Sequence, residues 1–172
     1  MSTKRVFFAL WPDDRQRDRL RNAISPFARQ IEGTAVYRGN WHVTLAFVGS
    51  FPSERIPALL EAAAAVRIEP FRLRFDRVEY WPRPKLAVLL AQAVPSELEA
   101  LVDALGVVLT DAGIATDDRR FRPHITFTRR ARNFETERLA QSVDTEWDHF
   151  ELLESLTEPG GSSYRPVKLQ GD

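Results

Sequence analysis

The stretch RPHITFTRR, residues 122–130, repeats the pattern of an earlier stretch, WHVTLAFVG, residues 41–49. Each contains a histidine, a β-branched apolar residue, a threonine and another apolar residue, in the same order. The chain has 3 histidines, and His42 and His124 both lie in these frames. Residues i and i+2 of a strand point to the same face. We therefore expect the histidine and threonine of each frame to share one face, while their apolar neighbours point into a core.

The predicted elements around the two frames occur in the same order. Each half reads strand, long helix, short strand, His-x-Thr strand, helix and strand. Pro26 should kink the first helix or start a new one capped by Ser25, and Ser96 with Glu99 has the pattern of a capping box. The first half contains residues 6–10, 13–31, 35–39, 41–49, 54–66 and 71–81, and the second contains 86–91, 96–112, 122–130, 134–141, 147–157 and 163–170.

This duplicated order predicts an α+β fold in which two pseudo-symmetric antiparallel sheets, flanked by helices, face each other across a central cleft. The whole chain, residues 1–172, is interpreted as one domain. The prolines of WPRPK, residues 81–85, mark the boundary between lobes of about residues 1–81 and 84–172. Exchange of strands between the lobes is allowed by this interpretation.

Composition narrows the functional classes. The 24 basic residues balance the 24 acidic ones, so a general nucleic-acid coating protein is not expected and phosphate recognition must be local. The absence of cysteine excludes disulfides and thiolate chemistry. No apolar run has the length of a membrane span, and we interpret the start of the chain as a strand and not a signal peptide. We expect a cytoplasmic protein.

Two imidazoles facing one substrate suit general acid–base catalysis, one protonated and one free. The hydroxyls of Thr44 and Thr126 could donate hydrogen bonds to phosphoryl oxygens. A phosphodiester fits this equipment without a metal ion. Two surface strands that carry His and Thr by chance remain an alternative, and a metal site, with Asp117 and Asp118 as further ligands, ranks lower. The third histidine, His149, lacks the threonine and is interpreted as structural or solvent-facing.

The motifs HVTL and HITF resemble those of the two-histidine (2H) phosphoesterases. The similarity is greatest to the bacterial and archaeal RNA 2′,3′-cyclic phosphodiesterases, also called 2′-5′ RNA ligases or LigT-like proteins. It extends over nearly the whole chain, from the opening RVFFALWP to a closing hairpin in LLESLTEPGGSSYRPVKLQ. Trp41 and Phe127 depart from the aliphatic residues that are more usual in the family.

The resemblance implies a metal-independent hydrolase that opens a terminal RNA 2′,3′-cyclic phosphate to a 2′-phosphate. His42 would be the proton donor to the departing 3′ oxygen, and His124 would accept the proton of water. Thr44, Thr126 and Arg129 would bind the phosphate. No cofactor is implied. Reversal of the reaction would form a 2′-5′ linkage.

Other contacts are open alternatives. Phe8 and Tyr164 are candidate substrate contacts, and Trp11 and Tyr37 could also stack on a base. Four arginines could contact an RNA backbone, although such residues are usually solvated: Arg38, Arg119, Arg120 and Arg122. The expected partner is an RNA with a 2′,3′-cyclic phosphate end, for example a tRNA fragment, or a nucleotide, and the expected state is a monomer away from the membrane. Alternatives are a non-catalytic RNA-end-binding module, or a phosphodiesterase for small cyclic nucleotides or 2′-5′ linkages.

Overall fold

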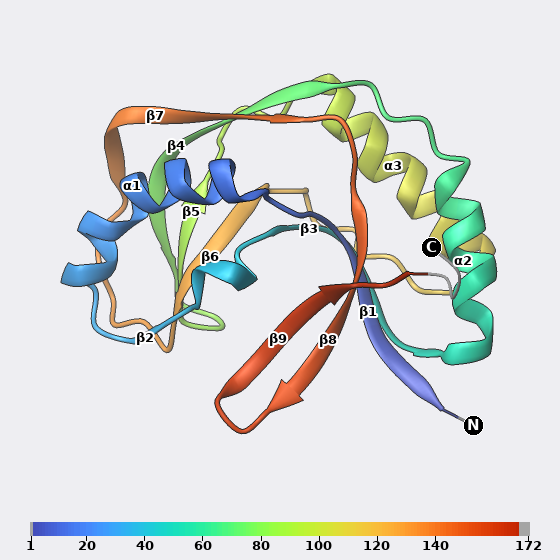
Figure 1. Ribbon diagram of the computed structural model, residues 1–172. Coiled ribbons are helices and arrows are strands. Elements are labelled where there is room, and N and C mark those ends of the chain that lie inside the picture. The colour runs from blue at the N-terminus through green and yellow to red at the C-terminus, as the bar shows by residue number, and fades with distance from the viewer. Residues whose placement is uncertain (1, 169–172) are drawn as a thin grey trace.

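The computed structural model describes residues 2–168 of the chain. Two antiparallel sheets form its framework, and three α-helices pack against them (Figure 1). The first sheet has the strand order β3-β1-β8-β9, and the second has the order β2-β6-β5-β4-β7. The predicted α+β class, with two antiparallel sheets flanked by helices, is confirmed.

The first sheet joins strands from opposite ends of the sequence. Its strands are β3 (Val43–Pro52), β1 (Thr3–Leu10), β8 (Glu151–Glu158) and β9 (Gly161–Pro166). β1 pairs with β3 on one side and with β8 on the other. The hairpin of β8 and β9 projects from the body of the molecule in Figure 1.

The second sheet also combines the two halves of the sequence. Its strands are β2 (Thr34–Ala35), β6 (His124–Arg129), β5 (Leu86–Leu90), β4 (Phe71–Trp81) and β7 (Glu137–Trp147). The two His-x-Thr frames therefore belong to different sheets: the first begins one residue before β3, and the second lies on β6. Within these sheets β3 is an edge strand, whereas β6 lies between β2 and β5.

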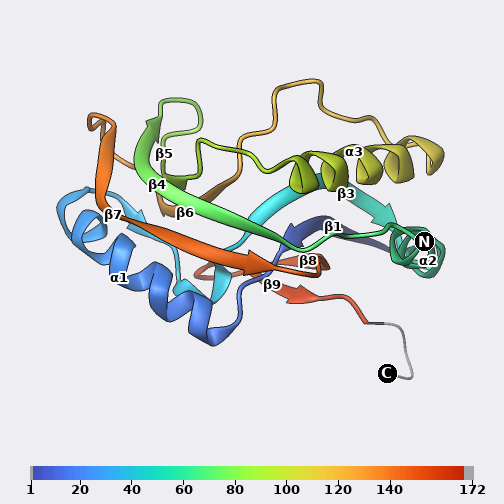
Figure 2. The ribbon, with the colours of Figure 1, turned by 90° about the horizontal axis from the view of Figure 1, so that it is seen from above.

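The helices cover the apolar faces of the sheets. They are α1 (Asp14–Gln30), α2 (Ile56–Ala64) and α3 (Ser96–Asp111), with short 3-10 turns at Arg38–Asn40 and Ser53–Arg55. Helix α1 contacts β7 and β6, whereas α3 contacts β3 and α2 (Figure 2). Leu20 of α1, Leu101 of α3, Phe8 of β1 and Phe127 of β6 belong to one continuous core cluster. None of the helices within residues 2–168 is long and apolar enough to cross a membrane.

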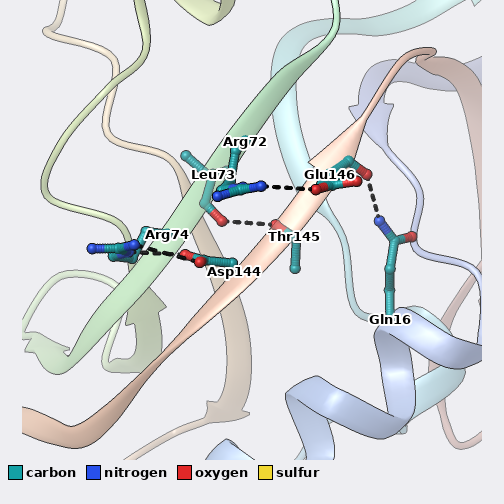
Figure 3. Close-up of polar contacts among 7 residues, drawn as sticks. All are labelled: Gln16, Arg72, Leu73, Arg74, Asp144, Thr145 and Glu146. Carbon is teal, nitrogen blue, oxygen red and sulfur yellow. Dashed lines mark hydrogen bonds and ion pairs between the residues drawn. The ribbon is translucent and has the colours of Figure 1, made fainter.

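The pairing of β7 with β4 contradicts one prediction, a helix over residues 134–141. The chain from Glu137 is instead the edge strand β7, which is paired with β4. Figure 3 shows the far end of this ladder, where Arg74 Nε donates to Asp144 Oδ1 at 2.8 Å and Arg72 Nη2 donates to Glu146 Oε1 at 3.1 Å. A local stretch of sequence cannot show these pairs, because the partners lie far apart along the chain. Pairing between strands then overrides the local preference for a helix.

Other local predictions also need correction. The strand expected over 35–39 is limited to Thr34–Ala35, and a 3-10 turn follows it. α1 continues through Pro26, so no new helix begins at Ser25. Pro95 occupies the N-cap of α3 without a side-chain capping bond, so the capping box at Ser96 is wrong. Residues 169–170 of the predicted final strand lie outside the described part of the chain.

Candidate active site

His42 is held on both of its ring nitrogens. Its Nδ1 lies 2.8 Å from the carbonyl oxygen of Asn40, and its Nε2 lies 3.0 Å from Oγ1 of Thr44. A carbonyl can only accept, so Nδ1 must carry a proton. In the neutral ring Nε2 therefore accepts the hydrogen bond donated by the Thr44 hydroxyl. The basic nitrogen of His42 thus points toward the hydroxyl two residues along the same strand.

His124 has the same backbone anchor. Its Nδ1 lies 2.7 Å from the carbonyl oxygen of Arg122, again two residues upstream. The neutral ring is therefore protonated at Nδ1, which leaves Nε2 with a free electron pair for proton transfer. The two frames share their tautomer as well as their sequence pattern.

Burial confirms the predicted alternation along both frames. Val43 and Ile125 are both 0% exposed, whereas the histidine and threonine of each frame are only partly buried. The hydroxyl of Thr126 therefore lies on the same strand face as His124. We name this face of the two sheets, which bears both histidines, the site face.

Two β-bulges change which later residues reach the site face. On β3 the register with β1 shifts between Thr44 and Ala46, so Phe47 lies opposite Phe7 and its ring is 6.3 Å from it. On β6 the register with β5 shifts between Thr126 and Thr128, so Arg129 lies opposite Leu86. A bulge reverses the alternation beyond it. Phe47 and Arg129 therefore occupy equivalent places, each following a His-x-Thr frame.

Aromatic rings and one arginine link the two sheets around His42. The centroid of the His42 ring lies 5.0 Å from that of Phe7 and 4.9 Å from that of Tyr164, and the Tyr164 ring is inclined to the His42 ring by 75°. Tyr164 comes from β9 of the first sheet, and its Oη accepts a long hydrogen bond of 3.4 Å from Nη2 of Arg129 in the second. Arg129, the last residue of β6, is therefore brought close to His42.

The predicted substrate contact of Phe8 is wrong. Phe8 is 0% exposed and packs in the main core, where its ring lies 5.9 Å from that of Phe150. Phe7 is on the opposite face of β1, which contacts His42. The run VFFAL is apolar on both faces, so its composition contains no alternation from which the face could be chosen.

Burial lowers the pKa of both histidines. For His42 the pKa falls to about 4, because desolvation outweighs the hydrogen bond to Asn40, and the charges of His124 and Arg129 lower it further. For His124 burial is again the main cause, opposed by the bond to the Arg122 carbonyl and supported by the Arg122 guanidinium. Both rings are therefore neutral near pH 7 when no anion is bound.

The remaining candidates lie at different distances from the histidines. The Trp11 ring is 6.5 Å from the His42 ring. The Arg17 guanidinium lies over the Trp11 ring, 4.6 Å from its centroid. Tyr37 is 73% exposed, and Arg38 pairs with Asp18. Arg119 pairs with Asp117, while Arg120 is exposed in the same loop. His149 is exposed and pairs with Asp148.

Two hollows in the surface of the protein lie away from His42 and His124. A hollow of about 310 Å³ is lined by Phe8, Leu60 and His149 among others, and a smaller one of about 200 Å³ is lined by Val102 and Phe121. Neither contains His42 or His124. Among residues 2–168 no three His, Asp or Glu side chains gather as metal ligands would. The site is therefore defined by the matching backbone anchors of the two histidines and by the effect of His124 on the pKa of His42.

Several known proteins are similar to this chain over nearly their full length. The RNA 2′,3′-cyclic phosphodiesterase of Archaeoglobus fulgidus is 25% identical, with 96% of this chain and 98% of the relative covered. The enzyme of the same name from Escherichia coli is 28% identical over 96% of this chain and 94% of its own. The crystal structure of E. coli LigT complexed with 3′-AMP superposes with a TM-score of 0.86 and 27% identity, covering 97% of each chain.

The two sheets, each presenting a His-x-Thr frame, give the chain the fold and the motifs that are expected of a two-histidine phosphoesterase. The sequence pattern of the family described as LigT like phosphoesterase matches residues 10–88, which include the first frame. Over most of its length the chain is therefore similar to LigT-like phosphoesterases.

Proposed function

We propose that this enzyme hydrolyses a terminal 2′,3′-cyclic phosphate of RNA to a 2′-phosphomonoester by two-histidine acid–base catalysis, without a metal ion. The names of the full-length relatives support the substrate, and the matching anchors of His42 and His124 support the mechanism. The 2′,3′-cyclic end of a tRNA fragment is one such substrate. We also propose that the chain acts in the cytoplasm as a monomeric catalytic domain.

Each side chain of the site has one role in the hydrolysis. His124 Nε2 takes a proton from water as the water oxygen attacks phosphorus. The bond between phosphorus and the 3′ oxygen breaks, and His42 Nε2 gives its proton to that oxygen, which leaves as a 3′-hydroxyl. Thr44 and Thr126 donate hydrogen bonds to the phosphoryl oxygens, and Arg129 offsets the charge that develops there. The 2′ oxygen retains the phosphate.

The observation that carries the mechanism is the close contact of Nδ1 in both rings with a backbone carbonyl, 2.8 Å in His42 and 2.7 Å in His124. Each backbone carbonyl favours the tautomer in which Nε2 is the basic nitrogen, free in His124 and hydrogen-bonded to the Thr44 hydroxyl in His42. One nitrogen can then deprotonate water while the other protonates the leaving oxygen. A module that only binds phosphate has no need of a fixed basic nitrogen.

The low pKa of His42 makes its protonation depend on the substrate. An isolated site with a pKa of about 4 contains little protonated His42 at neutral pH. A phosphodiester anion about 4 Å away would favour the imidazolium by about 4 kcal/mol at an effective dielectric constant near 20. That attraction is large enough to bring the pKa back toward neutrality. Substrate binding would thus generate the acid that the reaction consumes.

Phe7 and Phe47 replace Phe8 as the proposed floor for the terminal base. Phe47 is 67% exposed beside Phe7, whose ring adjoins His42. Tyr164 lies between His42 and Arg129, where its hydroxyl can reach a bound phosphate. Aromatic rings stack on any base, so this floor would impose little sequence preference.

Ligation uses the same groups. If the 5′-hydroxyl of a second RNA replaces water, His124 takes its proton, its oxygen bonds to phosphorus and the 3′ oxygen leaves with the proton of His42. The product is a 2′-5′ linkage with a free 3′-hydroxyl. The balance between hydrolysis and ligation then depends on which nucleophile is present.

A short RNA ending in a 2′,3′-cyclic phosphate tests the function directly. We expect wild-type protein to convert it to an RNA with a 2′-phosphate, at the same rate with and without EDTA. The product end is identified by mass and by its resistance to an enzyme that requires a 3′-phosphate. Tight binding without turnover would favour a binding module instead, and loss of turnover in EDTA would contradict the metal-free mechanism.

The pH dependence should differ between free and substrate-bound enzyme. Raising the pH deprotonates His42, and lowering it protonates His124, so the kcat/KM profile should be bell-shaped with its maximum below the ordinary histidine pKa of about 6.5. The bound anion stabilises protonated His42, so the alkaline limb of kcat should lie at higher pH than that of kcat/KM. A profile that is flat from about pH 5 to 9 with chemistry rate-limiting, or a kcat limb at lower pH, would refute this assignment.

A further inference from the structure

A closed ring of contacts surrounds His124 on the second sheet. Trp81 places its ring 4.2 Å from the His124 ring, tilted by 52°. Arg122 holds His124 Nδ1 with its backbone carbonyl and lays its guanidinium over Trp81 at 5.2 Å from the ring centroid. Both side chains are bound to Glu79, which accepts from Trp81 Nε1 at 3.1 Å and from Arg122 Nη2 at 3.0 Å.

Glu79 is the residue that joins the two arms. It lies two residues before Trp81 on β4, so both side chains point to the site face. Its side chain is 21% exposed, whereas that of Arg122 is 46% exposed. Both of its carboxylate oxygens lie 3.0 Å from Nη2 of Arg122. A partly buried carboxylate with a charged and a neutral donor is well satisfied and has little freedom to turn toward an anionic substrate.

We propose that Glu79 is a positioning residue for His124, acting through Trp81 on the ring and through Arg122 on the Nδ1 anchor. The carboxylate fixes the indole against one side of the imidazole. It also keeps the Arg122 guanidinium folded over Trp81, which holds the preceding loop and its carbonyl in place. This inference rests on the proposed function, in which His124 Nε2 must be aimed at the attacking water.

The charge of Glu79 has a second effect. The Arg122 guanidinium lowers the pKa of His124, and an anion bonded to that guanidinium reduces its influence. Other titratable or charged groups on this face include His42, directly before β3, Arg129 of β6 and Arg77 of β4, the last of which is paired with Asp76. Glu79 is the carboxylate bonded directly to Arg122. Its removal should therefore change the pKa of His124 mainly by leaving the Arg122 charge without its partner.

Two substitutions should shift the pKa of His124 in opposite directions. In Glu79→Gln the amide oxygen can still accept from Trp81, but the Arg122 charge is no longer offset, so the pKa of His124 should fall. In Arg122→Met the backbone carbonyl is retained and the charge is lost, so the pKa of His124 should rise. NMR titration of the His124 ring measures both. A purely structural role would not produce shifts of opposite sign.

Kinetics provide the second readout. We expect Glu79→Gln to lower kcat about 10- to 100-fold with KM within about twofold, since a misaimed base slows chemistry without weakening binding. Glu146→Gln is the matched control, because Glu146 also pairs with an arginine, here Arg72 of β4 (Figure 3), which lies at the end of that strand away from Glu79. It should leave both kcat and the His124 titration unchanged.

The outcomes separate this inference from the proposed function. Unchanged titration and unchanged kcat in Glu79→Gln would overturn the positioning role, as would shifts of the same sign in both variants. A loss of thermal stability alone would do the same. If wild-type protein failed to hydrolyse the cyclic phosphate, the proposed function would fall, whereas the opposite shifts of His124 would still establish the network.

Discussion

Replacing either His42 or His124 by alanine should lower kcat on a 2′,3′-cyclic phosphate RNA by about 10²- to 10⁴-fold, the usual contribution of a positioned acid or base. The double variant should be scarcely slower than the worse single one, because the two groups act on one displacement. Single-turnover rates measure the chemical step. His149→Ala is the control, since that ring is exposed and paired with Asp148.

The leaving group distinguishes the two roles. A cyclic phosphate releases an alkoxide that needs a proton, whereas an aryl phosphodiester releases a phenolate that does not. With an activated aryl substrate, His42→Ala should therefore recover most of its activity while His124→Ala stays slow. Recovery of His124→Ala instead would exchange the assignments of acid and base.

Thr44→Val and Thr126→Val should each lower kcat/KM by about 10²-fold or more. Valine keeps the branched shape of threonine, so the strand and its packing are retained while one hydrogen bond to the developing phosphoryl charge is lost. Preorganised donors of this kind contribute about 10²- to 10³-fold. The Thr44 variant should also release the Nε2 of His42 from its 3.0 Å hydroxyl partner.

Thr157→Val provides the matched comparison for these hydroxyls. Thr157 is an exposed β8 residue that lies opposite Ser162 in the hairpin and outside both frames. Its loss should leave the rate unchanged. If all three valine variants remained within about twofold of wild type, the threonines would not hold the transition state as proposed.

The part of the site that sequence reasoning predicts best is the pair of frames themselves. Period-2 alternation is enforced where one face is a core, so the inward orientation of Val43, Leu45, Ile125 and Phe127 followed directly from the pattern. The tautomers and the lowered pKa values could not be predicted, because they depend on the carbonyls of Asn40 and Arg122 and on the depth of burial.

Register accounts for most of what was missed. Phe7 was overlooked in favour of Phe8 because only pairing with β3 decides which face of β1 adjoins His42. The bulge that aims Arg129 at the site face involves Phe127, which otherwise continues a regular alternation. Glu79 and Trp81 are separated from His124 by more than 40 positions in the sequence, and no local signal joins them. The alternation FRLRFDRVEYW could have suggested that they share a face, although not which strand lies opposite.

The placement of β1 between β3 and β8 has a consequence for biosynthesis. During translation the first strand, Thr3–Leu10, leaves the ribosome long before Glu151–Glu158, its second neighbour in the sheet. Until that segment emerges, one edge of β1 lacks its partner, and Tyr164 is not yet available to bridge to Arg129. Catalytic competence should therefore appear late and nearly all at once, and nascent chains stalled before the closing hairpin should have no activity.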